Sequence, residues 1–116
     1  MDALRAWLTD GGALVDGVEV RTAATGRGVF AARALPEGAV VVRVPRAHLV
    51  LKERVRASSL ARQLRDANLE LSSPHALFAA WLAVERRSPR SPFLPYFASL
   101  PTDFSAMPFH AGPAED

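Results

Sequence analysis

The segment Thr25-Gly26-Arg27-Gly28-Val29 contains the residues of this sequence whose types and spacing could best serve a ligand. Two glycines flank one arginine, and stretches rich in β-branched residues lie on either side. Because glycine has no Cβ, a Gly-x-Gly turn lets backbone N–H groups approach a carboxylate, a phosphate or an adenosyl group. The same residues also suit the turn of a plain β-hairpin. Their spacing by itself leaves both interpretations open.

Other kinds of reactive site find little support in the residues. The chain has no cysteine, which excludes disulfides, thiolate metal sites and cysteine nucleophiles. Its three histidines, His48, His75 and His110, lack the spacing of a metal site. The glycine segment is not followed by Lys-Ser or Lys-Thr, nor by a predicted helix, so it matches neither a phosphate-binding loop nor a dinucleotide fingerprint. We therefore predict no metal site, and the residues point to no catalytic group.

Length and composition indicate one globular domain. The chain has 116 residues, of which 49% are hydrophobic and 22% charged. The net charge is only +2, with thirteen arginines against the single lysine Lys52, so we expect no nucleic-acid partner. The longest apolar run, residues 76–84, is far shorter than the roughly 20 residues that cross a bilayer, and the N-terminus lacks a signal-peptide core. These features predict a soluble, intracellular protein with no membrane partner.

The first half of the chain must position the glycine segment, and its pattern predicts short strands. Residues 2–10 are expected to form a helix that the following glycines end. From residue 18 the hydrophobic period becomes two, which predicts strands and hairpins over residues 18–51. The expected turns are Thr25 to Gly28 and Leu35 to Gly38. The expected strands after the first turn are 29–32, 40–44 and a short one at 48–51.

The second half, residues 58–100, is predicted to be mainly helical. Ser58 or Ser59 is expected to cap one helix, and a serine before Pro74 is expected to cap the next. Residues 76–84 are apolar on every side, which predicts a helix that is buried all round. A short helix is expected within residues 93–100, and 101–116 has no regular period. The predicted fold class is thus α+β, with short strands followed by two or three helices.

Three motifs in this order resemble one known family, the SET-domain protein lysine methyltransferases. The motifs are "GRGVFAARALPEGAVVVRVPRAHLVL" at 26–51, "ALFAAWLAVERRS" at 76–88 and "SPFLPYFASLP" at 91–101. The last is similar to a signature of the Rubisco large-subunit methyltransferase branch, although Phe93 stands where that branch usually has tryptophan. The resemblance implies that residues 1–116 form the N-terminal portion of a SET domain, with β-clip-type strands and hairpins.

The resemblance also implies a cofactor and a partner. In that family the Gly-x-Gly segment holds S-adenosylmethionine, largely through backbone groups. By resemblance the cofactor-binding residues here would be Thr25, Gly26, Arg27, Gly28 and Val29, although some relatives carry glutamate in place of Thr25. The partner would be a protein substrate with a target lysine, and the compartment could be the cytoplasm, the nucleus or a plastid.

The catalytic motifs of the family are not found in this sequence. Relatives complete the site with an Asn-His dipeptide and with tyrosines, whereas here Asn68 precedes leucine and Tyr96 belongs to the Pro-Tyr signature. We therefore expect an incomplete domain: a cofactor-binding half that is inactive by itself, has no catalytic residue, and exposes faces of the helix at 74–87.

Two other interpretations stay open. The chain could be a non-catalytic SET-like module that binds a partner protein through its apolar helix and aromatic C-terminal segment. One version of this role is pairing with a separate chain that supplies the missing half. A third interpretation, an unrelated β-clip ligand-binding domain, is suggested only by "ARALPEGAVV" at residues 32–41.

Overall fold

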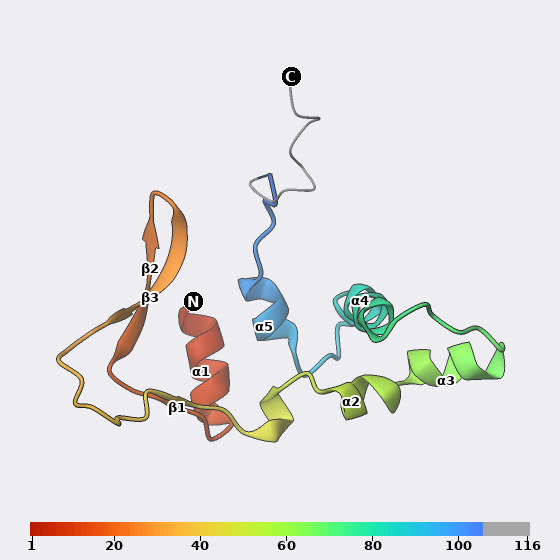
Figure 1. Cartoon of the computed structure of the whole chain (residues 1–116), viewed down its shortest axis with the longest axis horizontal. Coiled ribbons are helices and arrows are strands. Elements are labelled where there is room, and N and C mark those ends of the chain that lie inside the picture. Colours follow the sequence, from red (N-terminus) through yellow and green to blue (C-terminus); the bar gives the residue numbers. More distant parts are fainter. Residues whose placement is uncertain (106–116) are drawn as a thin grey trace.

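The computed structural model describes residues 1–105 and shows two parts of different character (Figure 1). We call residues 14–43, with four strands, the strand part, and residues 52–99, with four helices, the helical part. The Cα radius of gyration is 18.0 Å, whereas a compact domain of this length has about 13 Å. The expectation for residues 106–116, including the aromatic C-terminal segment, lies outside the described residues.

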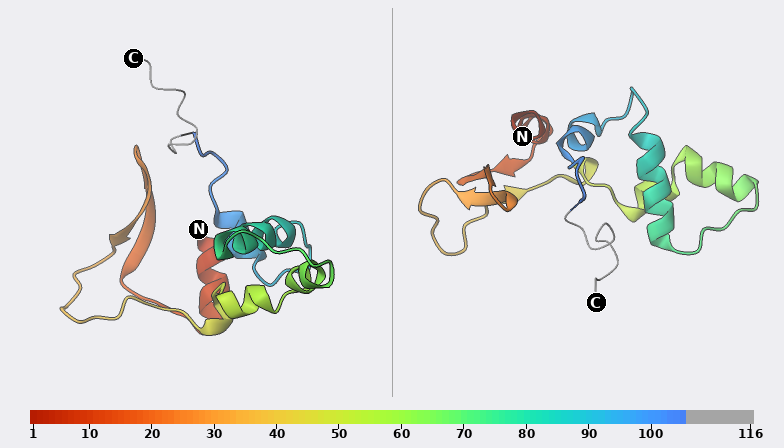
Figure 2. Two further views of the ribbon diagram at one scale, coloured as in Figure 1. Left: turned by 45° about the vertical axis from the view of Figure 1, so that its right-hand side comes forward. Right: turned by 90° about the horizontal axis from the view of Figure 1, so that it is seen from above.

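Helix α1 (Asp2–Asp10) lies between the two parts (Figures 1 and 2). The Trp7 side chain faces the helical part and packs against the His48 ring in a tilted arrangement, with ring centroids 4.4 Å apart. Gly11 follows the helix, and a Cβ there would lie only 2.0 Å from His48 Cε1. A glycine is therefore needed at this position so that the backbone can pass the imidazole ring.

The strands form two separate antiparallel pairs. Strand β1 (Leu14–Val15) pairs with β4 (Val42–Arg43), and β2 (Val18–Ala23) pairs with β3 (Gly26–Ala31). The expected strand at 40–44 is thus reduced to two paired residues, because β1 offers it only a two-residue partner.

The turn that precedes β4 contains the glycine expected there, but its register differs by one residue. The N–H of Ala39 donates to the carbonyl of Pro36 at 3.1 Å, and Gly38 has φ +79°. Pro36 is therefore the first residue of the turn instead of the second, and Gly38 takes the left-handed position that favours glycine.

The strand expected at residues 48–51 is not present. Arg46–His48 form a single 3-10 turn, η1, that follows the extended residue Pro45. Leu49 has extended angles, φ −105° and ψ 140°, but no neighbouring strand pairs with it. The prediction was wrong because an extended apolar stretch becomes a strand only where a second strand supplies hydrogen-bond partners.

The helical part consists of α2 (Lys52–Arg56), α3 (Ser59–Asp66), α4 (Pro74–Glu85) and α5 (Leu94–Ser99). The two expected serine caps are confirmed: Ser58 Oγ accepts from the Ala61 N–H at 3.3 Å, and Ser73 Oγ accepts from the Ala76 N–H at 3.2 Å. Pro74 occupies the first turn of α4, where a missing N–H costs nothing.

The hydrophobic core lies within the helical part. Val55, Trp81, Phe93 and Phe97 are buried. The Trp81 ring meets the rings of Phe93 and Phe97 edge-on, with 5.9 Å between the centroids of Trp81 and Phe93. Trp7 extends this cluster from α1, 6.0 Å from Phe93 between centroids. No residue from 1 to 50 is itself buried, so the strand part has no core of its own.

Helix α4 is not buried all round as predicted. Trp81 is its single buried residue, and the Val84 side chain is 55% exposed. The helix packs against α2 and α3, and Trp81 contacts α5 through Phe97. Because residues 76–84 are apolar on every side, each face of the helix could be buried. Among residues 1–105, however, neighbours cover only some of these faces. None of the described helices is long and apolar enough to cross a membrane.

Candidate functional site

The glycine segment lies in the β2–β3 hairpin, but it is not the turn of that hairpin. Ala23 pairs with Gly26, so the connecting turn is the two-residue loop Ala24-Thr25. Gly26, Arg27, Gly28 and Val29 belong to β3. The expectation of a Thr25 to Gly28 turn is corrected accordingly: Thr25 lies at the tip, and the other three residues of the expected turn lie in the strand.

The strand geometry separates the five predicted site residues. Arg27 pairs with Thr22 and Val29 with Val20, and these side chains share one face of the hairpin. Gly26 and Gly28 lie on the opposite face. The structure therefore does not bring the five side chains to one point; what they share is a continuous stretch of backbone.

The glycines leave that backbone open to approach on their face. A Cβ at Gly26 would meet no atom within 4 Å, and one at Gly28 would meet only the Phe30 ring, at 3.3 Å. Gly26 also has φ +121°, a conformation that residues with a side chain rarely adopt. A ligand can therefore reach the main chain at Gly26 without removing any side chain.

The outer edge of β3 supplies further polar groups. The N–H of Ala32 donates to the carbonyl of Gly17 at 2.9 Å, which makes this pair hydrogen-bonded. Because such pairs alternate along an antiparallel ladder, the N–H and C=O groups of Arg27 and Val29 point away from β2. Within residues 1–105 no strand pairs with this edge. These backbone groups could therefore hold the polar atoms of a ligand.

The Arg27 side chain ties the hairpin to helix α5. Its Nη2 donates to the carbonyl of Ser99 at 2.7 Å, across 72 residues of sequence, and its Nη1 lies 2.9 Å from Met1 Sδ. A guanidinium that donates to a carbonyl at the C-terminal end of a helix also interacts favourably with the helix dipole. Arg27 therefore positions the segment, and its charged group is already engaged.

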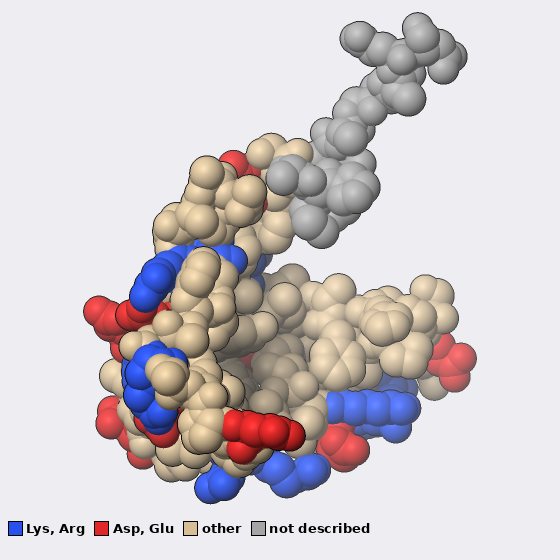
Figure 3. All heavy atoms as spheres, turned by 60° about the vertical axis from the view of Figure 1, so that its left-hand side comes forward, with Lys and Arg blue, Asp and Glu red and all other residues tan. Residues whose placement is uncertain are grey.

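A groove of about 350 Å³ lies beside the hairpin, between α1 and the strands. Val29 is the one predicted site residue that lines it, together with Val18 and Val20 of β2. The space-filling view in Figure 3, turned from the view of Figure 1, shows a hollow whose visible walls carry few charged side chains. The groove lies on the face of Val29, opposite the face of the two glycines, and its surface is mainly apolar. This surface suits the non-polar part of a ligand held at the outer edge of β3.

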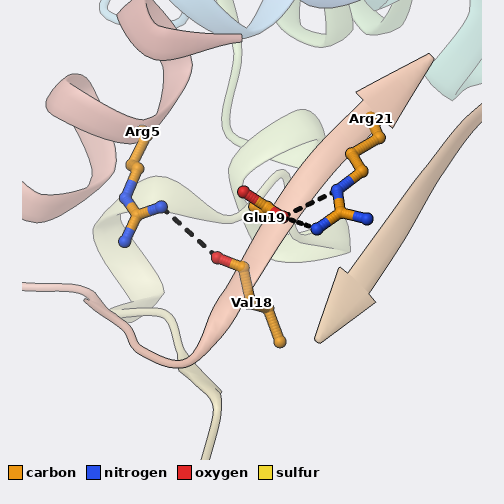
Figure 4. Close-up of polar contacts among 4 residues, drawn as sticks. All are labelled: Arg5, Val18, Glu19 and Arg21. Atoms are coloured by element: carbon orange, nitrogen blue, oxygen red, sulfur yellow. Dashed lines mark hydrogen bonds and ion pairs between the residues drawn. The ribbon is translucent and has the colours of Figure 1, made fainter. Parts of the chain in front are cut away.

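Arg5 connects the helix and the strands that form this groove, and the sequence alone did not identify this role. From α1 it donates to the carbonyl of Val18, at 3.3 Å (Figure 4), and to that of Val15, at 3.2 Å. The helix period places Arg5 on the polar side of α1, but no local signal shows that two strand carbonyls lie opposite. Its role depends on contacts 10 and 13 residues away along the chain.

The face of the hairpin that carries Gly26 and Gly28 also carries a local charged cluster. Arg21 pairs with Glu19, and its Nε lies 2.6 Å from Glu19 Oε1 (Figure 4). Its guanidinium also lies over the Phe30 ring, 5.3 Å from the centroid. All three residues belong to β2 or β3, so the cluster stiffens the hairpin without connecting it to other elements.

No grouping of reactive side chains accompanies the glycine strand within residues 1–105. No cluster of histidines and carboxylates there could hold a metal ion. The hydrogen bond from the Ser105 backbone N–H lowers the pKa of the Asp103 carboxyl. Asp103 lies outside both the hairpin and the groove. The site is thus a set of backbone groups beside an apolar groove, and it has the character of a binding site.

Comparison with known proteins identifies the fold. No family model matches the chain, and no curated protein matches it significantly. A crystal structure of the SET domain of LSMT, bound to methyllysine and AdoHcy, has a similar fold, with a TM-score of 0.73 and 22% sequence identity. The matched region covers 88% of this chain and 23% of that one, so this chain spans about a quarter of its length. The expected α+β class is confirmed, and the chain has the fold of part of a SET domain.

Proposed function

We propose that this chain is the cofactor-binding N-terminal part of an S-adenosylmethionine-dependent protein-lysine methyltransferase of the SET type. The observation that carries the proposal is the fold match to a SET domain whose crystal structure holds AdoHcy and methyllysine. The three sequence motifs support the finer assignment to the Rubisco large-subunit methyltransferase branch, through the Pro-Tyr signature that ends at Pro101.

Thr25, Gly26, Arg27, Gly28 and Val29 are the residues that we propose to contact S-adenosylmethionine. Gly26 and Gly28 leave the main chain open, and the polar backbone groups of Arg27 and Val29 point away from β2. The charged side chain of Arg27 bonds to Ser99 and serves to hold the strand in place. The cofactor supplies the methyl group, and these residues would bind and orient it.

We assign no catalytic residue to this chain. In methyl transfer a neutral lysine amine displaces the methyl group in line, which needs close alignment and exclusion of water. The sequence has no Asn-His dipeptide, and its one tyrosine, Tyr96, lies in α5. A complete lysine site therefore needs groups that residues 1–116 do not supply, either from a longer polypeptide or from a second chain.

The binding test is a titration of the chain with S-adenosylmethionine, followed by backbone amide NMR shifts. We expect weak binding, with the largest shifts at residues 25–29. Gly28→Val should abolish these shifts because its side chain blocks approach to the backbone, while Phe30 can move to accept it. The matched control is Ala31→Val, which introduces the same residue three positions further along β3, opposite Val18, and should preserve binding.

Shifts that stay unchanged in Gly28→Val, or that fall elsewhere in the molecule, would contradict the proposed cofactor site. The enzymatic part of the proposal has its own test in the coding sequence. If the reading frame continues past the codon for Asp116 into an Asn-His pair and a later tyrosine, lysine methylation is supported. A stop codon at that point would contradict methyltransferase activity for this chain by itself.

A non-catalytic role in binding a partner protein is a second proposal, and the exposed apolar surface of the helical part favours it. Val84 on α4 and Leu94 and Tyr96 on α5 are 55%, 38% and 37% exposed. A partner that supplies the rest of the domain would cover such surface. Light scattering that finds a monomer at all concentrations, together with pull-downs that recover no partner, would contradict this role.

A further inference from the structure

A second groove, of about 500 Å³, lies on the helical part, away from the glycine strand. It is lined by residues of α2, α3, the start of α4 and the connection between α3 and α4. Its apolar lining includes Leu64, Leu69, Leu71, Leu77 and Phe78. Leu69 is 58% exposed and Leu71 40% exposed, so this apolar surface is open to solvent.

The charged lining of this groove is unbalanced. Lys52 and Arg56 on α2 and Arg65 on α3 line it, against a single carboxylate, Glu70. The ion pairs among the described residues are Arg21–Glu19 and Arg33–Asp16, both in the strand part. The three cations therefore face the groove with no carboxylate partner within residues 1–105.

One of these cations is held in place. Arg65 Nη1 donates to the carbonyl of Arg56 at 3.1 Å, which fixes the Arg65 guanidinium beside the C-terminal end of α2. An anchored arginine loses less side-chain entropy when it binds a carboxylate, and its planar fork suits that group. The groove thus combines an apolar surface with a preorganised cationic group.

We propose that this groove binds a segment of another protein in which large apolar side chains are flanked by carboxylates. The apolar side chains would cover Leu69 and Leu71, and the carboxylates would pair with Lys52, Arg56 and Arg65. A small inorganic anion would leave the leucines exposed, and a flat bilayer surface would not reach into a groove. This inference does not depend on the proposed methyltransferase function.

The test is selection of peptides from a random 16-residue display library with the whole chain as bait. We expect the enriched peptides to combine acidic residues with large apolar ones. Their affinity, measured by fluorescence anisotropy, should fall about tenfold or more in the double variant Lys52→Glu/Arg56→Glu and should weaken with added salt. The control Arg87→Glu/Arg90→Glu reverses two exposed arginines outside the groove and should change affinity by less than about twofold.

A second variant tests the apolar half of the proposal. Leu69→Ser changes a largely exposed residue, so the fold should survive, and circular dichroism verifies this. Peptide affinity should fall several-fold with no change in its salt dependence. The proposal is overturned by failure to enrich any peptide, by enriched peptides without an acidic excess, by equal losses in the groove and control variants, or by binding to phosphatidylserine vesicles without peptide binding.

Discussion

The strand part and the helical part of this chain are stabilised by different kinds of contact. All the buried residues of the described chain lie between Val55 and Phe97, in the helical part. The strand part has none and depends on backbone pairing, on Arg5 and on Arg27. One part has an apolar core, and the other is held by polar contacts at its edges.

This difference explains why the candidate cofactor site is open. A strand that binds a ligand through its backbone must keep one edge and one face uncovered. The hairpin does so at Gly26 and Gly28, at the cost of burying almost nothing itself. Segments with little burial have the lowest local stability, and ligand-binding segments are commonly of this kind. The helical part therefore serves as the support on which the hairpin is placed.

The largest difference between the two parts is expected when one large side chain is removed from each. Phe93 is 1% exposed at the centre of the core, so Phe93→Ala should lower the free energy of unfolding by about 3–5 kcal/mol. Val29 is 70% exposed, and Val29→Ala should lower it by about 0.2–1 kcal/mol, the value of its cross-strand pair with Val20. Urea denaturation followed by far-ultraviolet circular dichroism measures both. Losses of similar size would show that the strand part has a core after all.

A smaller effect is expected where the two parts are joined. Arg27→Met removes the hydrogen bond to the Ser99 carbonyl and should lower the free energy of unfolding by about 1 kcal/mol. The backbone amides of both β3 and α5 should then exchange with deuterium faster. Arg21→Met is the control, because its contacts with Glu19 and Phe30 stay inside the hairpin, and it should change exchange there alone. Faster exchange of α5 in the control as well would refute the role of Arg27 as the connection.

The smallest effect is expected at Asp103, which belongs to neither part. The hydrogen bond from the Ser105 N–H lowers the pKa of Asp103 in the folded chain, so its contribution is present above the ordinary carboxyl pKa and is lost as pH falls through the lowered value. Ser105→Pro removes the donor and should raise the Asp103 titration midpoint measured by NMR. Because this carboxyl is fully exposed, the unfolding temperature should not change with either substitution or pH in that range.

Local sequence signals were sufficient for the N-terminal ends of α3 and α4 and for the fold class. Ser58, Ser73 and Pro74 act within one helical turn, so their roles could be predicted from neighbours three residues away. Motif order was enough to indicate the SET-type fold. These features depend on short-range geometry, which the sequence encodes directly.

Features that depend on a partner far along the chain could be determined only from the tertiary structure. Residues 48–51 have the sequence preference of a strand but no strand pairs with them, whereas Gly26 to Gly28 pair with β2 and form a strand in place of the expected turn. The partner of Arg27 lies 72 residues away, and α4 is covered on one side and open on another. The sequence by itself determined which groups could pair, bind or be buried. Only the fold decided which of them met, because pairing and burial both need a second surface that local sequence does not specify.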